Sequence, residues 1–525
     1  MTTWLREHVA DITSTLVIGA AVLVYASGVW GLPEGRYNSP DEAANALFAT
    51  RVAQGKPVAV YSPLNVATHG TLIRPRSTVV AGAYLVPASF LGLPVWGGSI
   101  ARVVGKSVLP YLSALAAALG LTVFYLLLCE FFGKRSALFG VALLAIQPMY
   151  WYYHSRGLFH NALFFDVLLL AWWLTLRLRR RPTIGAALAA GLAYGVAVSF
   201  RLSEAPWVVA ALVVWILCDP ELRTKIKQLP MIVVGACLGL LPVIVAQGFV
   251  HGAATSLGYP APGTPGGTAP GLWGLLFPFD FHLRTIWNTV GSTVVKLQWW
   301  FAVPAAAGFA VLVVQWQKLE PKVRAFTLAL VLAGFWLVLM YGSLPIVASP
   351  DPTAGVTLGE AHARYWLPLS AVGIWFTVYV LSLQQRRQWV MYTVFILSLM
   401  FSYLSVVNEP HEGIAAVRRN VRTFQVTSQV VLAQVPPGSV IVAGIADKIF
   451  WPKREVIINP NEPDHFRIIS DLVRGGTRVF SYQSLVAERV SNIFGSTSLA
   501  LYGLELDFIS VVNDGYGLYE FKSVP

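Results

Sequence analysis

The sequence predicts a mainly α-helical protein that crosses a membrane many times and ends in a small α/β domain. Hydrophobic residues make up 56% of its 525 residues and charged residues only 12%, whereas soluble domains carry about 25% charged residues. The apolar residues gather in long runs between short charged loops, and shorter alternating elements follow from residue 410. These three observations predict a polytopic helix bundle, residues 1–409, followed by an α/β domain, residues 410–525.

About eleven apolar runs are long enough, or nearly so, to cross a bilayer as helices. The first is expected to remain as a transmembrane helix, because its flank MTTWLREH is only weakly basic and Ala26-Ser27-Gly28 is a poor signal-peptide cleavage site. The runs are 12–32, 107–129, 136–153, 160–178, 183–200, 204–218, 230–250, 290–314, 325–346, 365–383 and 389–407.

Alternate loops between these runs are rich in Lys and Arg, and this pattern predicts the orientation of the chain. The positive-inside rule places the basic loops and the amino terminus in the cytoplasm. An odd number of spans then puts the carboxyl-terminal domain outside the plasma membrane, together with the first loop, residues 33–106. The apolar piece 79–96 of that loop is interrupted by Pro87 and Pro94 and is expected to be interfacial or re-entrant. The basic loops are 133–135, 177–181, 221–227, 317–324 and 384–388.

The carboxyl-terminal domain is predicted from short alternating strands and helices. The expected strands are 439–445, 454–460, 477–483, 506–512 and 516–522, and the expected helices are 465–476 and 485–496. The Pro/Gly-rich stretch 258–271 is expected to be a flexible external loop.

The net charge of +12 does not indicate nucleic-acid binding, because the basic residues lie in short loops of a membrane protein. Its three cysteines, Cys129, Cys218 and Cys237, show neither zinc-ligand spacing nor a disulfide framework.

Two adjacent carboxylates, Asp41 and Glu42, follow Ser39-Pro40 in the first external loop. Ser39 and Glu42 fit an S-x-x-E capping box, and Pro40 suits the first helical position. Adjacent helical residues diverge by about 100°, so a capping Glu42 leaves Asp41 to project elsewhere. The pair is therefore both a helix start and a candidate catalytic site.

Three further clusters place ionisable residues at the predicted external ends of apolar runs. The segment HSRGLFHNALFFD, residues 154–166, ends with a carboxylate inside a span, where such groups usually face a cavity. FRLSEAP, residues 200–206, is explained most simply by a local Arg201–Glu204 ion pair. GEAHARYWLPL, residues 359–369, places an arginine before two interfacial aromatic residues, where it could hold a lipid phosphate.

The acidic pair in the first external loop, the apolar bundle, the Arg364–Leu369 segment RYWLPL and the external carboxyl-terminal domain together resemble the GT-C glycosyltransferases. The resemblance covers about residues 10–410 and is nearest to the protein O-mannosyltransferases and the lipid A aminoarabinose transferases. It implies that Asp41 is the catalytic base or acceptor-binding carboxylate, that Glu42 helps to bind substrate or a metal, and that Arg364 binds the donor phosphate. The implied cofactor is a divalent metal, Mg²⁺, Mn²⁺ or Zn²⁺.

The chain departs from that family at Asn161, since many relatives carry an aspartate in this D-A-L-x-F context. His160 or Asp166 could replace the missing acid, the chain could work with fewer carboxylates, or it could have lost activity. The predicted catalytic residue is Asp41, and the predicted substrate-binding residues are Glu42, His154, Arg156, His160, Asn161, Asp166, Arg201, Glu360, His362, Arg364 and Tyr365.

The expected activity is inverting transfer of a sugar from a polyprenyl-phosphate-linked donor to an acceptor hydroxyl at the external face. The acceptor would be a glycan, lipid or protein, and membrane lipids and membrane-protein partners are also expected. One alternative is a non-catalytic GT-C-like scaffold, which Asn161 favours. Another is a transporter, which would need polar residues near the bilayer midplane.

Overall fold

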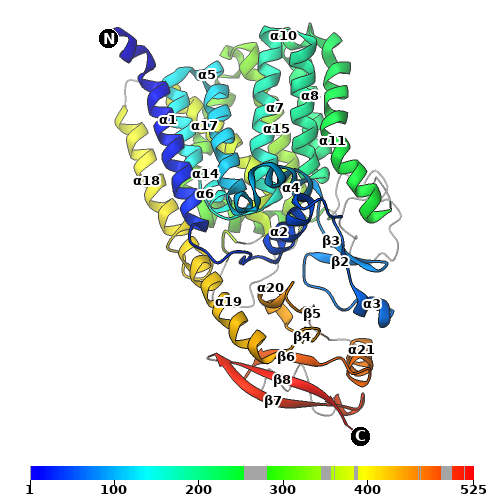
Figure 1. The fold of residues 1–525 in the computed structure, drawn as a ribbon. Helices are drawn as coiled ribbons and strands as arrows, with labels where there is room; N and C mark the ends of the chain where they lie inside the picture. The colour runs from blue at the N-terminus through cyan, green and yellow to red at the C-terminus, as the bar shows by residue number, and fades with distance from the viewer. Residues whose placement is uncertain are drawn as a thin grey trace.

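The computed structural model describes residues 2–252, 279, 281–344, 356–359, 361–383, 388–458, 460, 463–485, 499–513 and 515–524. A helix bundle forms one end of the molecule and the carboxyl-terminal sheet forms the other (Figure 1). The bundle helices are α1 Thr2–Val29, α5 Leu112–Ile146, α6 Pro148–His154, α7 His160–Arg180, α8 Ile184–Phe200, α9 Ala205–Cys218, α10 Pro220–Arg223, α11 Leu229–His251, α13 Leu283–Val290, α14 Leu297–Val314, α15 Pro321–Gly342, α16 Ala361–Tyr365, α17 Leu367–Leu383 and α18 Gln388–Val406.

The bundle is that of a multi-pass membrane protein. Seven helices in the described ranges are long and apolar enough to cross a bilayer, or eight if α8 and α9, between which the chain bends by 120°, count as one broken span. The apolar helix α17 is shorter. The number of about eleven spans therefore stays a prediction.

Helix α5 contains a reversal that explains two of the predicted runs. Gly133, at φ 79° and ψ 163°, is non-helical, and a Cβ built on Gly140 would lie 2.3 Å from Leu128 Cδ1. These two residues would be about 18 Å apart in a continuous helix. The chain therefore folds back at Gly133, and its two halves correspond to the predicted runs 107–129 and 136–153.

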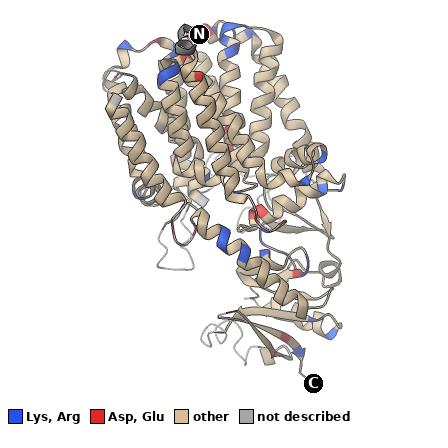
Figure 2. Cartoon of the chain, turned by 60° about the vertical axis from the view of Figure 1, so that its left-hand side comes forward, with Lys and Arg blue, Asp and Glu red and all other residues tan. Residues whose placement is uncertain are grey.

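The amino terminus and the carboxyl-terminal domain lie at opposite ends of the bundle (Figure 1). Figure 2 shows that many Lys and Arg residues gather at the end near the amino terminus. This distribution is the one on which the positive-inside rule relies. It supports a cytoplasmic amino terminus and an external carboxyl-terminal domain, which remain predictions.

Helices α8 and α11 pack closely through glycines spaced four residues apart on each helix. Gly191 and Gly195 on α8 lie against α11, and Gly239 on α11 lies against α8; a Cβ built on Gly195 would be 2.1 Å from the carbonyl oxygen of Ala236. Small residues in this spacing allow membrane helices to approach each other closely.

We expect Gly195→Ala to separate these helices and to destabilise the protein by about 1–3 kcal/mol, as overpacking usually does. Thermal unfolding of the purified protein in detergent measures the change. Gly248→Ala on α11 is the matched control, because a Cβ there meets nothing within 4 Å. Equal melting temperatures for the two variants would contradict this account of the packing.

The first loop, residues 33–106, is a folded layer at the end of the bundle. It contains α2 Pro40–Ala53, β1 Val60–Tyr61, α3 Pro63–Ala67, β2 Thr78–Ala81, β3 Tyr84–Pro87 and α4 Gly92–Val104. The strands form an antiparallel sheet in the order β1-β3-β2.

In this layer residues 79–96 form two separate elements, whereas one was expected; their interfacial location stays a prediction. Residues 78–87 form a β-hairpin, in which Gly82 takes a positive φ of 58° at the turn, and α4 follows separately. Pro87 ends β3 and Pro94 lies in the first turn of α4, so neither proline interrupts a spanning helix.

The carboxyl-terminal region contains a five-stranded mixed sheet in the order β5-β4-β6-β8-β7. Strand β4 is parallel to β5 and β6, and β8 is antiparallel to β6 and β7. All five predicted strands are present, whereas the predicted helix 485–496 lies outside the described residues apart from its first position. The elements are α19 Ile414–Gln434, β4 Val440–Val442, α20 Asp447–Phe450, β5 Glu455–Ile457, α21 Pro463–Arg474, β6 Val479–Ser484, β7 Leu504–Asn513 and β8 Tyr516–Ser523.

A shared apolar core joins the first loop to this sheet. Ala44 and Phe48 of α2 belong to the same buried cluster as Ile449, Phe450 and Trp451 around α20. Burial of apolar surface at such a contact favours a fixed arrangement of the two parts. Helix α2 is therefore held between the bundle and the carboxyl-terminal sheet.

Candidate active site

The capping box predicted at Ser39 is present and begins α2. The Ser39 N–H donates to Glu42 Oε2 at 2.9 Å, and the Ser39 hydroxyl accepts from the first-turn backbone. Pro40 occupies the first turn, as expected. This start directs the side chains of Asp41 and Glu42 to different partners.

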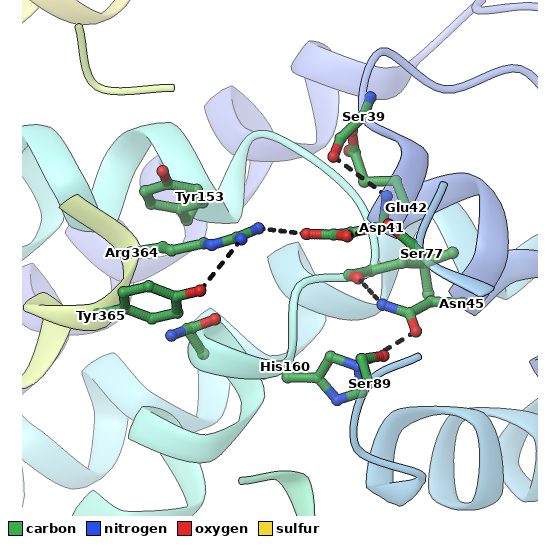
Figure 3. A network of polar contacts seen from close by, with 12 residues as sticks. Ser39, Asp41, Glu42, Asn45, Ser77, Ser89, Tyr153, His160, Arg364 and Tyr365 are labelled. Atoms are coloured by element: carbon green, nitrogen blue, oxygen red, sulfur yellow. Dashed lines mark hydrogen bonds and ion pairs between the residues drawn. The ribbon is translucent and has the colours of Figure 1, made fainter. Parts of the chain in front are cut away.

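Asp41 pairs with Arg364 of α16 (Figure 3). Asp41 lies near the start of the bundle sequence and Arg364 near its end. Arg364 Nη1 lies 2.5 Å from Asp41 Oδ2, and the Ser77 hydroxyl donates to Asp41 Oδ1. The Asp41 side chain is 27% exposed and that of Arg364 18%, so solvent still reaches the pair. Burial raises the pKa of Asp41, but Arg364 and Ser77 outweigh it and hold that pKa below its ordinary value.

The pair lies at a small pocket between α2, the start of α7 and α16. Four of the predicted site residues besides Asp41 line it: His160, Asn161, Arg201 and Arg364. The other lining residues are Asn45, Ser89, Phe90 and Phe159. The structure therefore brings residues from all four sequence clusters together.

Arg201 lies at the break between α8 and α9 and adds a second cation to the pocket. Its Nε is 2.7 Å from Glu204 Oε1, which confirms the predicted local ion pair. Its Nη2 donates to the Tyr341 hydroxyl at 2.8 Å, and Nη1 lies 3.3 Å from Asn161 Oδ1. The amide of Asn161 thus faces a guanidinium that is already paired with a carboxylate.

The ring of Tyr365 joins the two arginines. The guanidinium carbons of Arg201 and Arg364 lie 4.8 and 5.2 Å from its centroid, and the ring stacks on Tyr341 at 4.7 Å. Such cation–π contacts hold guanidinium groups without neutralising them. The pocket therefore presents two guanidinium groups, of which Arg364 is paired with Asp41 and Arg201 with Glu204.

His160 contacts Asn45, which lines the pocket from α2 together with Asp41. The Asn45 amide nitrogen donates to the Leu158 carbonyl at 2.9 Å, which orients its oxygen toward His160 Nε2 at 3.1 Å. The network therefore assigns the proton to Nε2, and in the neutral ring the lone pair is on Nδ1. The side chain of His160 thus places an imidazole group in the lining of the pocket.

Glu42 faces away from the pocket and makes a buried ion pair with Arg156. Arg156 Nη2 donates to Glu42 Oε2, and Nη1 donates to the Tyr152 hydroxyl at 2.8 Å. Their side chains are only 4% and 5% exposed. Burial alone would lower the pKa of Arg156, but Glu42 more than offsets it and raises that pKa. Glu42 and Arg156 thus fix α2 rather than line the pocket.

His154 and Asp166, which the sequence suggested as binding residues, also lie away from the pocket. Asp166 is fully buried, with Oδ2 2.9 Å from His154 Nε2 and Oδ1 2.8 Å from the Tyr150 hydroxyl. His154 Nδ1 lies 2.7 Å from the Tyr150 carbonyl. The carboxylate inside the span therefore faces polar side chains of α6, and Asp166 is absent from the pocket lining that includes Asn161.

The remaining predicted residues lie around α16. His362 is buried with Nε2 2.9 Å from the Leu344 carbonyl, and it is absent from the pocket lining. Glu360 lies outside the described residues.

A divalent metal at Glu42 does not fit this donor set. The Glu42 carboxylate is occupied by Arg156 and the Ser39 N–H, and the Asp41 carboxylate by Arg364 and Ser77. Among the described residues, no three His, Cys, Asp or Glu side chains gather as a metal site. Two guanidinium groups disfavour a dication here, because carboxylate sites for Mg²⁺ and Mn²⁺ rely on uncompensated oxygen donors.

Several residues at the site were not predicted from the sequence. Asn45 could have been found from the sequence, because it lies four residues after Asp41 and residues four apart share one helix face. Ser77, Ser89 and Tyr341 had no such signal, since they reach the site only through tertiary contacts.

The architecture is similar to that of solved GT-C structures. The crystal structure of ArnT from Cupriavidus metallidurans bound to undecaprenyl phosphate matches with a TM-score of 0.61 and 13% identity, over 96% of this chain and 97% of that chain. The apo form of the same enzyme matches with a TM-score of 0.56 and 15% identity, over 96% and 97% of the two chains. At these identities the match establishes the fold, and it confirms the GT-C resemblance.

Two further comparisons are weaker. Residues 99–247 match the family model described as dolichyl-phosphate-mannose-protein mannosyltransferase, a segment that includes Arg201 but neither Asp41 nor Arg364. An Archaeoglobus fulgidus oligosaccharyltransferase in complex with Zn and sulfate matches with a TM-score of only 0.44 and 13% identity, over 97% of this chain and 74% of that chain. A search of curated protein sequences finds no match.

Proposed function

We propose that this protein is an inverting glycosyltransferase that moves a sugar from a polyprenyl-phosphate-linked donor to an acceptor hydroxyl at the external face of the plasma membrane. One observation carries the proposal. Asp41 and Arg364 are 323 positions apart in the chain, yet they meet in one pocket at a predicted membrane face, beside Arg201. A base and two cations are the groups that transfer from a sugar phosphate needs.

In the proposed reaction, Asp41 accepts the proton of the acceptor hydroxyl as that oxygen attacks the anomeric carbon. The bond between the anomeric carbon and the phosphate oxygen breaks, and the polyprenyl phosphate leaves with the electron pair. Attack from the face opposite the phosphate inverts the anomeric centre. Arg364 and Arg201 stabilise the charge that develops on the leaving phosphate.

The Asp41–Arg364 pair explains how the charge on Asp41 could be neutralised before a donor binds. Without a donor, the guanidinium neutralises the carboxylate in a part-buried site. An arriving phosphate competes for Arg364, because arginine binds phosphate and carboxylate oxygens through the same donors. Asp41 is then left ionised beside the sugar. A lipid phosphate fits this role, and the structurally similar ArnT was crystallised with undecaprenyl phosphate.

Reconstitution tests the proposal directly. The purified protein in liposomes is supplied with a panel of labelled undecaprenyl-phosphate monosaccharides and with membrane lipid, glycan and peptide acceptors. We expect label to pass from at least one donor to an acceptor, with release of undecaprenyl phosphate. Absence of transfer from every donor, by protein that remains folded, would contradict the proposal.

A non-catalytic scaffold is the second candidate, and Asn161 supports it because the amide stands where relatives carry an acid. In that case the protein would be inactive alone and would copurify with membrane proteins. A transporter is less well supported, because Asp166, the carboxylate deepest in a predicted span, is enclosed by His154 and Tyr150.

The pH dependence of transfer should report the surroundings of Asp41. A base with a depressed pKa is active above that pKa, and its activity is lost as the pH falls through it. Arg364→Gln removes the largest influence that lowers the pKa of Asp41, so the acid limb of kcat/KM should move to higher pH. Ser77→Ala should move it in the same direction by less. Unchanged acid limbs in both variants would exclude Asp41 as the titrating base.

A further inference from the structure

The short helix α20 of the carboxyl-terminal domain contacts both chain segments that hold Asp41. One segment, residues 36–38, leads into the capping box of α2. The other, residues 76–77, carries the serine that donates to the Asp41 carboxylate. The successive residues Asp447, Lys448 and Ile449 each bond to one of these segments.

Asp447 makes the most extensive of these contacts. Its Oδ2 accepts from the backbone N–H of Arg76 at 2.6 Å, and Oδ1 accepts from Arg76 Nε and Nη2 at 2.9 and 2.7 Å. The Asp447 side chain is 1% exposed. Such charge-assisted bonds to both backbone and guanidinium fix the position of Arg76 strongly.

Lys448 and Ile449 hold the other segment. The Lys448 ammonium donates to the carbonyl of Asn38, the residue before Ser39. The Arg36 guanidinium donates to the carbonyl of Ile449 and, at 2.6 Å, to the Ser428 hydroxyl of α19. The approach to α2 is thus bonded to the carboxyl-terminal domain at Arg36 and at Asn38.

Ser77 requires this support because its backbone is in an unfavourable conformation. It has a φ of 61°, a left-handed value that residues other than glycine adopt at a cost in free energy. Arg76, held by Asp447, precedes it directly, and the Ser77 carbonyl accepts from Ala88 N–H at 3.0 Å. In this conformation the Ser77 hydroxyl reaches Asp41 Oδ1, as Figure 3 shows.

We propose that Asp447 is a positioning residue for Asp41, acting through Arg76 and Ser77, and that the carboxyl-terminal domain is therefore part of the transfer site. The proposal rests on the assigned role of Asp41. Asp447 orients the carboxylate for the acceptor proton and contacts neither donor nor acceptor. Its loss should lower kcat and leave the KM for the donor nearly unchanged.

A double-mutant cycle between Asp447→Asn and Ser77→Ala tests this chain of contacts, using the undecaprenyl-phosphate donor that the reconstituted wild type accepts. Each single variant should lower kcat about tenfold, the usual effect of losing a hydrogen bond to a charged group. If Asp447 acts through Ser77, the double variant should be no slower than Ser77→Ala alone. The acid limb of the pH profile should also move to higher pH in Asp447→Asn, because Asp41 loses the hydrogen bond that the Ser77 hydroxyl donates.

Asp507→Asn is the matched control in the same domain, since Asp507 makes an exposed ion pair with Lys522 on the β7–β8 hairpin. It should keep wild-type kcat and pH profile. Full activity in Asp447→Asn, or losses that simply multiply in the double variant, would overturn the proposal. If Asp447→Asn does not fold, Arg76→Gln replaces it in the cycle with the same expectations.

Asp41→Asn in the same assay separates this proposal from the proposed function. If that variant transfers sugar at the wild-type rate, the role of Asp41 fails and the positioning role fails with it. If Asp41→Asn is inactive while Asp447→Asn is unaffected, only the positioning role is overturned.

Discussion

Asp41→Asn is expected to lower the rate of sugar transfer by about 10²–10⁴-fold, the range that general-base catalysis usually supplies. Asparagine keeps the size of the side chain and does not alter the capping box, which uses Ser39 and Glu42. It cannot accept the acceptor proton. Undecaprenyl phosphate should still bind, because Arg364 loses a competing carboxylate when the charge on Asp41 is removed.

Single-turnover transfer in liposomes and binding of undecaprenyl phosphate measure the two parts of this expectation. Asp464→Asn is the control, because Asp464 is exposed and pairs only locally with Arg467. A variant that lost lipid binding in proportion to its activity would show that Asp41 holds the ligand rather than accepting a proton.

Glu42→Gln is expected to destabilise the protein by about 3–5 kcal/mol, because it leaves the Arg156 guanidinium buried without its counter-charge. Thermal unfolding in detergent measures this loss. The double variant Glu42→Gln, Arg156→Gln should recover much of the stability, since a neutral pair leaves no buried charge.

The same experiment distinguishes a structural Glu42 from a metal ligand. Added Mg²⁺, Mn²⁺ or Zn²⁺ should not change the stability difference between wild type and Glu42→Gln. A difference that appears only in the presence of one of these ions would contradict the assignment of Glu42 to Arg156.

Local sequence signals predicted the parts of the fold that depend on neighbouring residues. The capping box at Ser39, the Arg201–Glu204 pair and the five carboxyl-terminal strands all follow from short-range patterns and are present. Residues 79–96 were predicted as one element because their apolar composition suits both a hairpin with a short helix and a single membrane element. Helix α19, amphipathic and rich in arginine, was not predicted at all.

The site was harder to predict, because it is built by contacts between distant segments. The resemblance to a family brought Asp41 and Arg364 together, and no local pattern could have done so. Asp166 was expected to face a cavity, since a carboxylate in a span usually does. Its partners His154 and Tyr150 come from the preceding helix α6, whose position beside α7 depends on tertiary packing. Ser77 and Asp447 carry no sequence signal for the same reason.

A structure of the protein with undecaprenyl phosphate in a lipid nanodisc would test the central claim most directly. We predict that the phosphate lies within hydrogen-bond distance of both Arg364 and Arg201, with the Asp41 carboxylate released from Arg364 and facing the position of the sugar. A phosphate bound elsewhere, for example among the arginines at the amino-terminal end of the bundle, with the Asp41–Arg364 pair intact, would contradict it.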